Sequence, residues 1–398
     1  MNKQLRTRTA IALAGVLAAA QAVAPTYAQA AAPAYAQAGP DKAVAVTCGE
    51  VISASLTVAN NLTCTGTALT IGASNVVLNL GSHTISGALA IGDPESGNTL
   101  TGDTVQNGTV TGTTVAISLS STKLTTLSRL TLTDNGLSTS KVIDPVIASG
   151  LLVEHSTISG GAGAVLSTSS SYMQALTASY DTIQSGLVEL VNGVGGSFSD
   201  DKFTNASLTL DEEGGDTVAN STFTNSPVAD EGSYSGDSFK TNTMSGASVG
   251  LLLDGPSGIQ VTDNTFSANN IGLMVAGDIP SPGGDSVTGN SFTKNKTAGA
   301  YVDEPDNSAD GYGNMSFTGN TVSRNGSAPD GTKDAGGNPV VGGIHIYVPG
   351  GTITVSNNTS SRNSGFGIWS LGSTASGTGN VSTGDQDKCG PLTLCTYK

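Results

Sequence analysis

One six-residue motif recurs four times toward the C-terminus and limits the possible folds more than any other feature. The motif begins and ends with asparagine, and its copies are NTFSAN (264–269), NSFTKN (290–295), NTVSRN (320–325) and NTSSRN (358–363). A glycine and an alternating stretch follow each copy: GLMV (272–275), GAYV (299–302), GIHI (343–346) and GIWS (367–370). Alternation with period two is typical of strands with one buried face. A strand-rich repeat of about 20–30 residues predicts a solenoid whose coils pack on their neighbours.

Weaker copies of the motif extend this pattern backward through the chain. They are DSFKTN (237–242), STFTN (221–225), DKFTN (201–205), DTIQSG (181–186), STISG (156–160) and NGTVTG (107–112). Counted together, the copies predict one all-β domain of roughly a dozen coils. The recurring asparagines fall where strands meet turns, and asparagine tolerates the left-handed backbone conformation. We therefore expect them to satisfy turn groups by stacking their amides from coil to coil.

Two parts of the sequence resemble a known superfamily. The segment VTCGEVISASLTVANNLTCTGTALTIGASNVVLNLGSHTISG (46–87) resembles the N-terminal coils of secreted bacterial β-helix-repeat proteins, and the GNSFTKN and GNTVSRN copies resemble their coil repeat. Over roughly 45–398 the chain is similar to the right-handed parallel β-helix proteins of the pectin-lyase-like superfamily. This resemblance implies a single-stranded right-handed parallel β-helix. It implies no single activity, because the superfamily includes lyases, hydrolases, epimerases, adhesins and accessory proteins.

The N-terminus has the features of a secretory signal. Basic residues in 1–8 precede a short apolar core, and Ala28-Gln29-Ala30 provides a small-residue cleavage site. The core is shorter than the about 18 residues of a membrane anchor. We predict a signal peptide (1–30), a flexible linker (31–44) and a β-helix domain (45–398), in a protein that is secreted or periplasmic and has no membrane span.

The charge of the chain limits its partners. Loss of 1–30 removes three basic and no acidic residues, so the net charge of −15 becomes −18. Such a surface argues against nucleic acid and anionic membranes as partners. The four cysteines form two local pairs, and we expect disulfides between Cys48 and Cys64 and between Cys389 and Cys395, one at each end. Free thiols or a metal site are the alternatives for these cysteines.

Alternation also predicts which side chains of the late coils point outward. One outward column reads Tyr301, His345 and Trp369, with Asp303 and Tyr347 beside it. We expect these residues to form an exposed aromatic platform. The fifth position of the six-residue motif supplies a column of cations, Lys294, Arg324 and Arg362. A buried unpaired cation is too costly, so the turn must aim these three side chains into solvent.

These two columns suggest recognition of an extracellular, acidic polysaccharide, with sugar rings on the aromatics and carboxylates on the arginines. The alternative for the same residues is a solvated turn with scattered surface aromatics. The favoured role is that of a binding or surface-scaffold protein. A polysaccharide lyase or hydrolase is the alternative, with Asp303 and either His345 or Tyr301 as acid and base. None of the superfamily motifs Gly-His-Gly, Arg-Ile-Lys or Asp-Pro-His-Glu occurs, so no catalytic residue is assigned.

Cofactors and metals are not expected from the sequence, with one open case. The insertion 303–314 contains Asp306, Ser308 and Asp310 with the spacing that begins a calcium loop, although the closing glutamate is missing. Calcium binding and a solvated acidic loop both remain open for this segment. Ice binding is not favoured, because the threonines form no regular Thr-x-Thr ladder.

Overall fold

The computed structural model describes residues 43–397, apart from 93–97, 135, 169–171, 192–194, 212–213, 233–235, 278–283, 304–314, 350–351 and 371–373. The predicted signal peptide (1–30) and linker residues 31–42 lie outside the described part, as does the insertion 304–314. Within that part, no helix is long and apolar enough to cross a membrane. The compact unit Lys42–Lys398 contains all of the structure discussed below.

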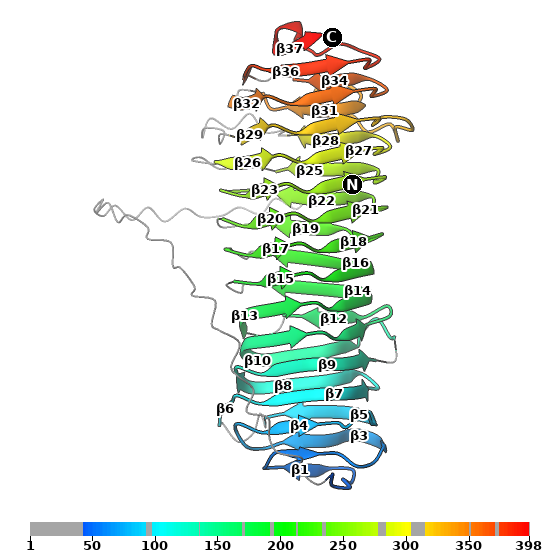
Figure 1. Cartoon of the computed structure of the whole chain (residues 1–398), viewed down its shortest axis with the longest axis vertical. Coiled ribbons are helices and arrows are strands. Elements are labelled where there is room, and N and C mark those ends of the chain that lie inside the picture. The colour runs from blue at the N-terminus through cyan, green and yellow to red at the C-terminus, as the bar shows by residue number, and fades with distance from the viewer. Residues whose placement is uncertain are drawn as a thin grey trace, which may run out of the picture. The chain divides into compact units, whose positions relative to one another are not determined.

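This unit is a stack of about 13 coils, and each coil pairs in parallel with the coils before and after it (Figure 1). Its described residues form 37 strands and one short 3-10 turn, η1 (Leu392–Leu394). The strands fall on three faces, which we call A, B and C. Along each coil the chain runs through face B, then C, then A, as β26, β27 and β28 do. The predicted all-β, right-handed parallel β-helix of roughly a dozen coils is confirmed.

The strands of each face follow one another in register. Face A contains β1 (Glu50–Ile52), β12 (Ala164–Ser167), β19 (Val228–Glu231), β22 (Val249–Asp254), β25 (Ile271–Ala276), β28 (Ala298–Asp303), β31 (Gly342–Tyr347) and β34 (Phe366–Trp369). Face B contains β2 (Leu56–Thr57), β4 (Val77–Asn79), β6 (Leu100–Thr101), β13 (Tyr172–Ser179), β15 (Ser197–Ser199), β17 (Thr217–Ala219), β20 (Ser238–Lys240), β23 (Gln260–Thr262), β26 (Asp285–Thr288), β29 (Met315–Thr318), β32 (Thr352–Ser356) and β35 (Thr374–Ser376). Face C contains β11 (Thr157–Ser159), β18 (Thr222–Thr224), β21 (Thr243–Ser245), β24 (Thr265–Ser267), β27 (Ser291–Thr293), β30 (Thr321–Ser323), β33 (Thr359–Ser361), β36 (Asn380–Thr383) and β37 (Cys395–Tyr397). Longer strands bend across two faces: β3 (Leu62–Ile71), β5 (Thr84–Ile91), β7 (Thr104–Thr111), β8 (Val115–Lys123), β9 (Thr126–Thr133), β10 (Lys141–Glu154), β14 (Thr182–Val191) and β16 (Lys202–Asp211).

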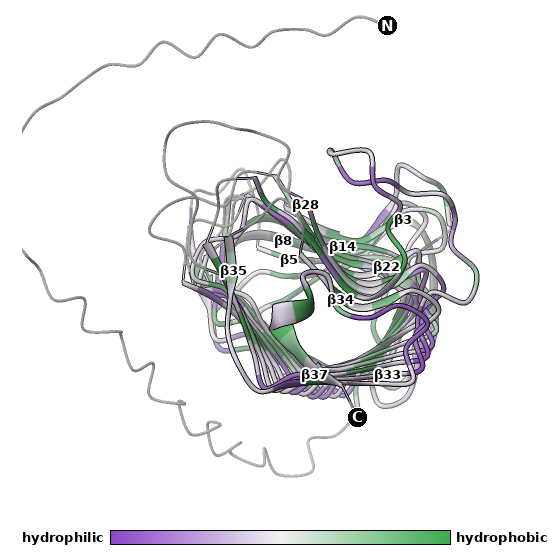
Figure 2. Ribbon diagram, turned by 90° about the horizontal axis from the view of Figure 1, so that it is seen from above, coloured by the Kyte–Doolittle hydropathy of each residue, from purple (hydrophilic) through white to green (hydrophobic). Residues whose placement is uncertain are grey.

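The core lies inside the coils, because alternate residues along the strands are buried. Figure 2 shows the coils from above, one behind another around this interior. In most coils face C places one apolar side chain at the same inward level, and Ser360 and Ser382 take this position in the last coils. Two pairs of these rings stack along the axis: Phe203 on Phe223 at 4.6 Å and Phe266 on Phe292 at 4.9 Å between ring centroids. Offset stacking of this kind adds to the stabilisation from apolar burial. Equivalent positions of the repeat therefore stack in columns of similar side chains inside the coils.

Asparagine ladders hold the turns on either side of face C, as the sequence predicts. In the first ladder, the backbone N–H and the Nδ2 of Asn290 both donate to the Oδ1 of Asn320, at 2.9 and 3.1 Å. Nδ2 of Asn290 also donates to the carbonyl of Val261 in the preceding coil. The second ladder repeats this arrangement, with Asn295 donating to Asn325. Each amide thus satisfies backbone groups that the turn would otherwise leave buried and unpaired.

The first ladder changes its chemistry toward the N-terminus, where aspartates replace asparagines. Asp181 accepts from the backbone of Ser156, and Asp201 accepts from the backbone of Asp181. Both are 2% exposed, and burial raises the pKa of Asp181 to about 8 and that of Asp201 to about 7. The charges of Asp201 and Glu154 raise the pKa of Asp181 further, and the charge of Asp200 raises that of Asp201. These two carboxyl groups therefore stay protonated at pH values well above those at which carboxyl groups usually ionise.

Both cysteine pairs predicted from the sequence are joined. Cys48 and Cys64 link the first coils, with Cα atoms 5.8 Å apart. Cys389 and Cys395 link the C-terminal cap, with Cα atoms 6.0 Å apart. Each disulfide therefore lies at one end of the stack.

Candidate functional site

The outward column of aromatic residues forms on face A in the register that alternation predicts. Tyr301 pairs with His345 in the next coil, and His345 pairs with Trp369 in the coil after that. Ile344 and Ile346, on either side of His345, both point into the core. The prediction of which side chains leave the core is therefore correct.

The prediction that this column is exposed is wrong. Tyr301, His345 and Trp369 are only 1%, 2% and 5% exposed. The cause is the insertion 326–341, which folds back over the outside of β28 and β31 as a hairpin. Its Val340 packs on Tyr301 in a small apolar cluster outside the main core. No exposed aromatic platform exists at these three positions.

Polar contacts fasten this hairpin to the late coils. At its start, Oδ2 of Asp330 accepts from Asn270 at 2.6 Å, and the backbone N–H of Asp330 donates to Thr297 at 3.1 Å. Further along, the backbone N–H of Ala335 donates to Asp303 at 3.2 Å. The hairpin therefore binds to coils that precede it by one and two turns.

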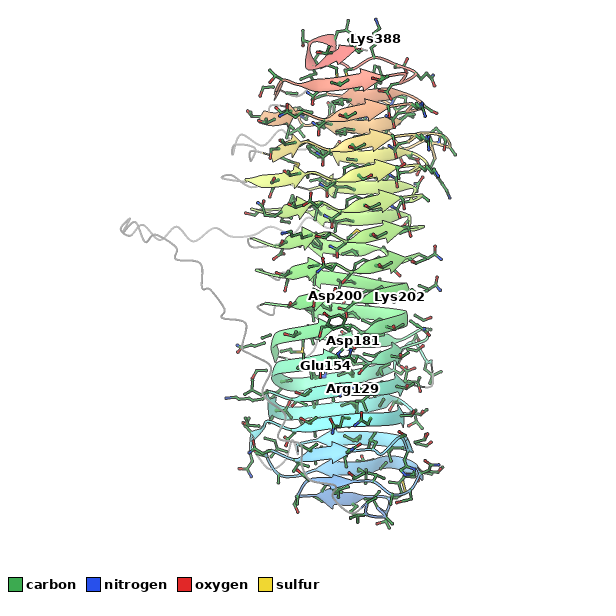
Figure 3. The ribbon with its side chains drawn as sticks, in the orientation of Figure 1. Arg129, Glu154, Asp181, Asp200, Lys202 and Lys388 are labelled. Carbon is green, nitrogen blue, oxygen red and sulfur yellow. A yellow bond between two sulfur atoms is a disulfide. The ribbon has the colours of Figure 1, made fainter. Side chains whose placement is uncertain are left out.

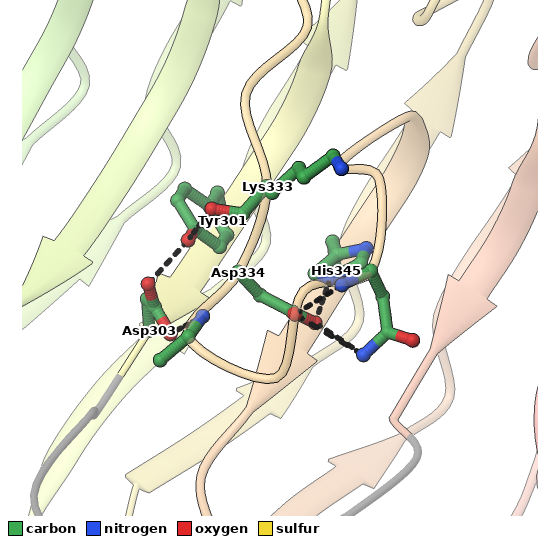
Figure 4. A network of polar contacts seen from close by, with 7 residues as sticks. Tyr301, Asp303, Lys333, Asp334 and His345 are labelled. Carbon is green, nitrogen blue, oxygen red and sulfur yellow. Dashed lines mark hydrogen bonds and ion pairs between the residues drawn. The ribbon is translucent and has the colours of Figure 1, made fainter.

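A buried polar network lies beneath the hairpin (Figure 4). Tyr301 donates its hydroxyl to Asp303 at 2.5 Å, and Nε2 of His345 lies 3.0 Å from Oδ2 of Asp334. Asp334 is 4% exposed and also accepts from the backbone and side chain of Asn338. The role of Asp334 could not be predicted from the sequence, because the residue lies in an insertion that belongs to no repeat.

The C-terminal cap covers the end of the same column. The rings of His345 and Trp369 stack at 4.1 Å between centroids and 17° between planes. Trp369 also forms a β-bridge with Gly390 of the cap. The two other residues of the predicted platform, Asp303 and Tyr347, are half-buried at its edge, and Gly336 of the hairpin lies against the Tyr347 ring.

The electrostatics of this network favour uncharged rings. Burial lowers the pKa of His345, and the opposing effect of Asp334 is smaller. Burial and the nearby carboxylate of Asp303 raise the pKa of Tyr301. A substrate would reach either ring only after displacement of the hairpin. As acid or base, both residues are therefore inaccessible in this conformation.

The cation column takes the position that the sequence predicts. Lys294, Arg324 and Arg362 are exposed in the turns from face C to face A, with backbone φ angles of 57°, 58° and 58°. Lys294 donates its backbone N–H to Ser323 and Arg324 donates to Ser361, so the three residues stack on successive coils. Among the described residues, the ion pairs join Lys141 to Asp144 and His345 to Asp334, and neither pair involves these cations. We call these three residues the cation ladder.

Face A carries a further outward column, which is made of acidic residues. Asp211, Glu231 and Asp254 are direct register partners on β16, β19 and β22, and they project outward from the uncovered part of the face. Burial raises the pKa of Glu231, and the charges of Asp211, Asp254 and Glu189 raise it further. The signal was available in the sequence, because each residue ends an alternating stretch at the position that Asp303 occupies later.

The described residues contain no group of three or more His, Cys, Asp or Glu side chains arranged to hold a metal ion. Asp306, Ser308 and Asp310 lie outside the described residues, so calcium binding there stays a prediction.

Comparisons with known proteins bear on the fold. Residues 206–382 match the family described as the right handed beta helix region. No curated protein matches the chain in sequence.

Solved structures with a similar fold have low sequence identity to this chain. The A-module of the Azotobacter vinelandii mannuronan C-5 epimerase AlgE6 aligns with a TM-score of 0.45 and 17% identity, over 82% of this chain and 90% of its own length. The Dettilon tailspike protein aligns with a TM-score of 0.43 and 15% identity, over 81% and 62% of the two chains. A tailspike mutant of E. coli bacteriophage HK620, in complex with a pentasaccharide, aligns with a TM-score of 0.42 and 12% identity. The alignment covers 88% of this chain and 72% of the tailspike chain. The parallel coils and the family match over residues 206–382 together show that the chain has the fold of a right-handed parallel β-helix.

Proposed function

We propose that the protein binds an extracellular acidic polysaccharide along the cation ladder. The observation that carries this proposal is that Lys294, Arg324 and Arg362 stack on successive coils without an ion-pair partner among the described residues. Coils in register lie about 4.8 Å apart, so three like charges are held close together in an acidic chain. An extended polymer with regularly spaced carboxylates would relieve this repulsion.

The backbone at these positions supports a role for the side chains themselves. All three residues adopt the left-handed conformation, which costs a non-glycine residue about 1–2 kcal/mol, and asparagine less. Earlier coils fill the same position with Asn205, Asn225, Gly246 and Ala268. Lysine and arginine offer the turn no conformational advantage over these residues. Their presence in three consecutive coils therefore favours selection for charge.

Charge-assisted hydrogen bonds would carry the recognition. The guanidinium groups of Arg324 and Arg362 can each take a carboxylate in a bidentate pair, and Lys294 supplies a point charge. The two disulfides fit an oxidising compartment outside the cytoplasm, where such a polymer would be met. The covered aromatic column contributes no stacking surface to this site.

The test is binding of polygalacturonate to the intact protein, with dextran as the neutral control polymer. The double variant Arg324→Gln/Arg362→Gln should bind polygalacturonate roughly tenfold more weakly, equivalent to about 1.4 kcal/mol. The difference should shrink as salt rises, because exposed charges are screened. The matched variant Lys123→Gln/Lys240→Gln removes two exposed cations elsewhere and should bind like the unmodified protein. Equal binding by both double variants would refute the proposal.

A second candidate function is hydrolysis of glycosidic bonds on the uncovered part of face A. Its support is the carboxylate column, in which Glu231 has a raised pKa between Asp211 and Asp254. Stacking at about 4.8 Å is close to the carboxyl separation of about 5–5.5 Å in retaining glycosidases. Release of reducing ends from a polysaccharide should then be lost in Glu231→Gln and kept in Asp263→Asn, an exposed acid on another edge. Absence of release by the unmodified protein over a broad panel of polysaccharides would exclude this candidate.

A further inference from the structure

A second column of exposed side chains runs along the turn between faces B and C. The residues of this column adopt the left-handed conformation in successive coils, and most of them are glycine, asparagine or aspartate, which suit it: Asn107, Asp200, Asn220, Asp263, Gly289, Gly319, Asn357 and Gly379, with Thr241 at one further position. Three consecutive coils depart from this pattern with Arg129, His155 and Tyr180, at φ 53°, 52° and 57°. Figure 3 shows Arg129 low and Asp200 higher on the stack, with Glu154 and Asp181 labelled between them and Lys202 beside Asp200.

The two rings of this column stack on each other outside the core. His155 and Tyr180 lie 5.0 Å apart between ring centroids, with 11° between their planes. Tyr180 donates its backbone N–H to Ser199 of the next coil, so Asp200 is its successor in the column. Because His155 covers one face of the Tyr180 ring, the opposite face points along the stack toward Asp200. Tyr180 is 58% exposed, and Asp200 is exposed as well.

Along the column, the tyrosine ring is followed by two short side chains, Asp200 and Asn220. The change in side-chain length leaves an open step on the surface, which we call the ledge. The ring of Tyr180 bounds the ledge on one side, and the polar side chains of Asp200 and Asn220 form its base. Lys202 is exposed two residues beyond Asp200, and Arg129 lies on the far side of His155. Cations and carboxylates are thus mixed around the ledge, unlike the uniform charge of the cation ladder.

The stability of the fold does not account for these rings. Left-handed backbone costs a bulky residue about 1–2 kcal/mol, and asparagine would be accepted here as it is at 107, 220 and 357. Neither ring belongs to the hydrophobic core. Large, flat and exposed aromatic side chains with adjacent hydrogen-bonding groups are typical of binding surfaces.

We propose that this ledge binds one ring of a neutral saccharide. The apolar C–H face of the sugar packs on the free face of Tyr180. Its hydroxyl groups donate to the carboxylate of Asp200 and exchange hydrogen bonds with the amide of Asn220. The site does not depend on the cation ladder, which lies at a different turn and in later coils.

The experiment measures binding of neutral hexasaccharides (cellohexaose, maltohexaose, xylohexaose and mannohexaose) to the intact protein by calorimetry. At least one should bind, and Tyr180→Asn should weaken that binding at least tenfold. Asparagine suits the left-handed conformation, so the thermal midpoint of this variant should not fall. Tyr180→Phe, which keeps the ring, should bind within about threefold of the unmodified protein. Asp200→Asn should weaken binding, because an amide cannot accept as many hydroxyl hydrogen bonds.

Two controls separate this site from the others. Tyr397→Asn removes another partly exposed tyrosine, at the C-terminal cap, and should leave binding unchanged. Arg324→Gln/Arg362→Gln should also leave it unchanged, whether or not polygalacturonate binding is lost. Binding of none of the four hexasaccharides would overturn the proposal. So would equal binding by Tyr180→Asn and the unmodified protein.

Discussion

Two of the aromatic columns described above lie outside the core, and they differ in exposure to solvent. Tyr301, His345 and Trp369 point away from the core of the late coils, yet the hairpin 326–341 and the C-terminal cap bury them. His155 and Tyr180 occupy a turn of the early coils, where no insertion among the described residues covers them, and Tyr180 is 58% exposed. The comparison teaches that leaving the core and meeting solvent are separate properties in a solenoid. The first is fixed by strand alternation and the second by the insertions between strands.

The largest expected effect is on the covered column. Trp369→Ala should lower the free energy of unfolding by about 3–5 kcal/mol, because it leaves a cavity between His345 and the cap. Urea denaturation followed by far-UV circular dichroism measures this loss. A loss below about 1 kcal/mol would mean that the cap does not pack on this ring.

The buried layer beneath the exposed column gives the next effect. Asp181 and Asp201 directly follow Tyr180 and Asp200 in the chain, and their pKa values of about 8 and about 7 lie above the unfolded value near 4. The folded protein therefore holds more protons than the unfolded chain at intermediate pH. Stability contributed by the neutral acids is present below about pH 4 and falls as pH rises through about 7–8.

Asp181→Asn/Asp201→Asn should remove this pH dependence, because later coils use asparagine in the same ladder. At pH 8 the double variant should be more stable than the unmodified protein by roughly 1–3 kcal/mol. Thermal midpoints at pH 5 and pH 8 measure the difference. An equal slope against pH in both proteins would contradict the raised pKa values.

The hairpin over the late column gives a smaller effect. Asp334→Ala leaves His345 and Asn338 without their buried carboxylate partner, which should cost about 1–2 kcal/mol. Asp387→Ala removes an exposed acid near the same end and is the control. Equal stability of the two variants would show that the buried pair does not hold the hairpin.

The exposed column should show the smallest effect on stability. Tyr180→Ala should change the free energy of unfolding by no more than about 0.5 kcal/mol, since most of the ring is in solvent. The measurement is the same urea titration used for Trp369→Ala. A loss as large as that of Trp369→Ala would erase the distinction between the two columns.

The sequence predicts the repeat, the parallel coils, the asparagine ladders and the orientation of Tyr301, His345 and Trp369, because all of these follow from local alternation. The covering of that column could not be predicted in this way. It depends on contacts such as Asp330 with Asn270, which are 60 residues apart and belong to no repeat. The cation ladder was predictable, since burial of unpaired Lys294, Arg324 and Arg362 would be too costly. The exposed column that contains His155 and Tyr180 was not predicted, because these residues lie in turns between the alternating stretches.

The central claim, that the late aromatic column is outside the core but covered, can be tested through Trp369, the only tryptophan in the chain. The measurement is collisional quenching of its fluorescence by iodide, with the urea-unfolded protein as the reference. The structure predicts a blue-shifted emission and quenching several-fold weaker than in the unfolded chain, because the ring lies between His345 and the cap. Quenching of the folded protein as strong as that of the unfolded chain would contradict the account and restore an exposed platform at these coils.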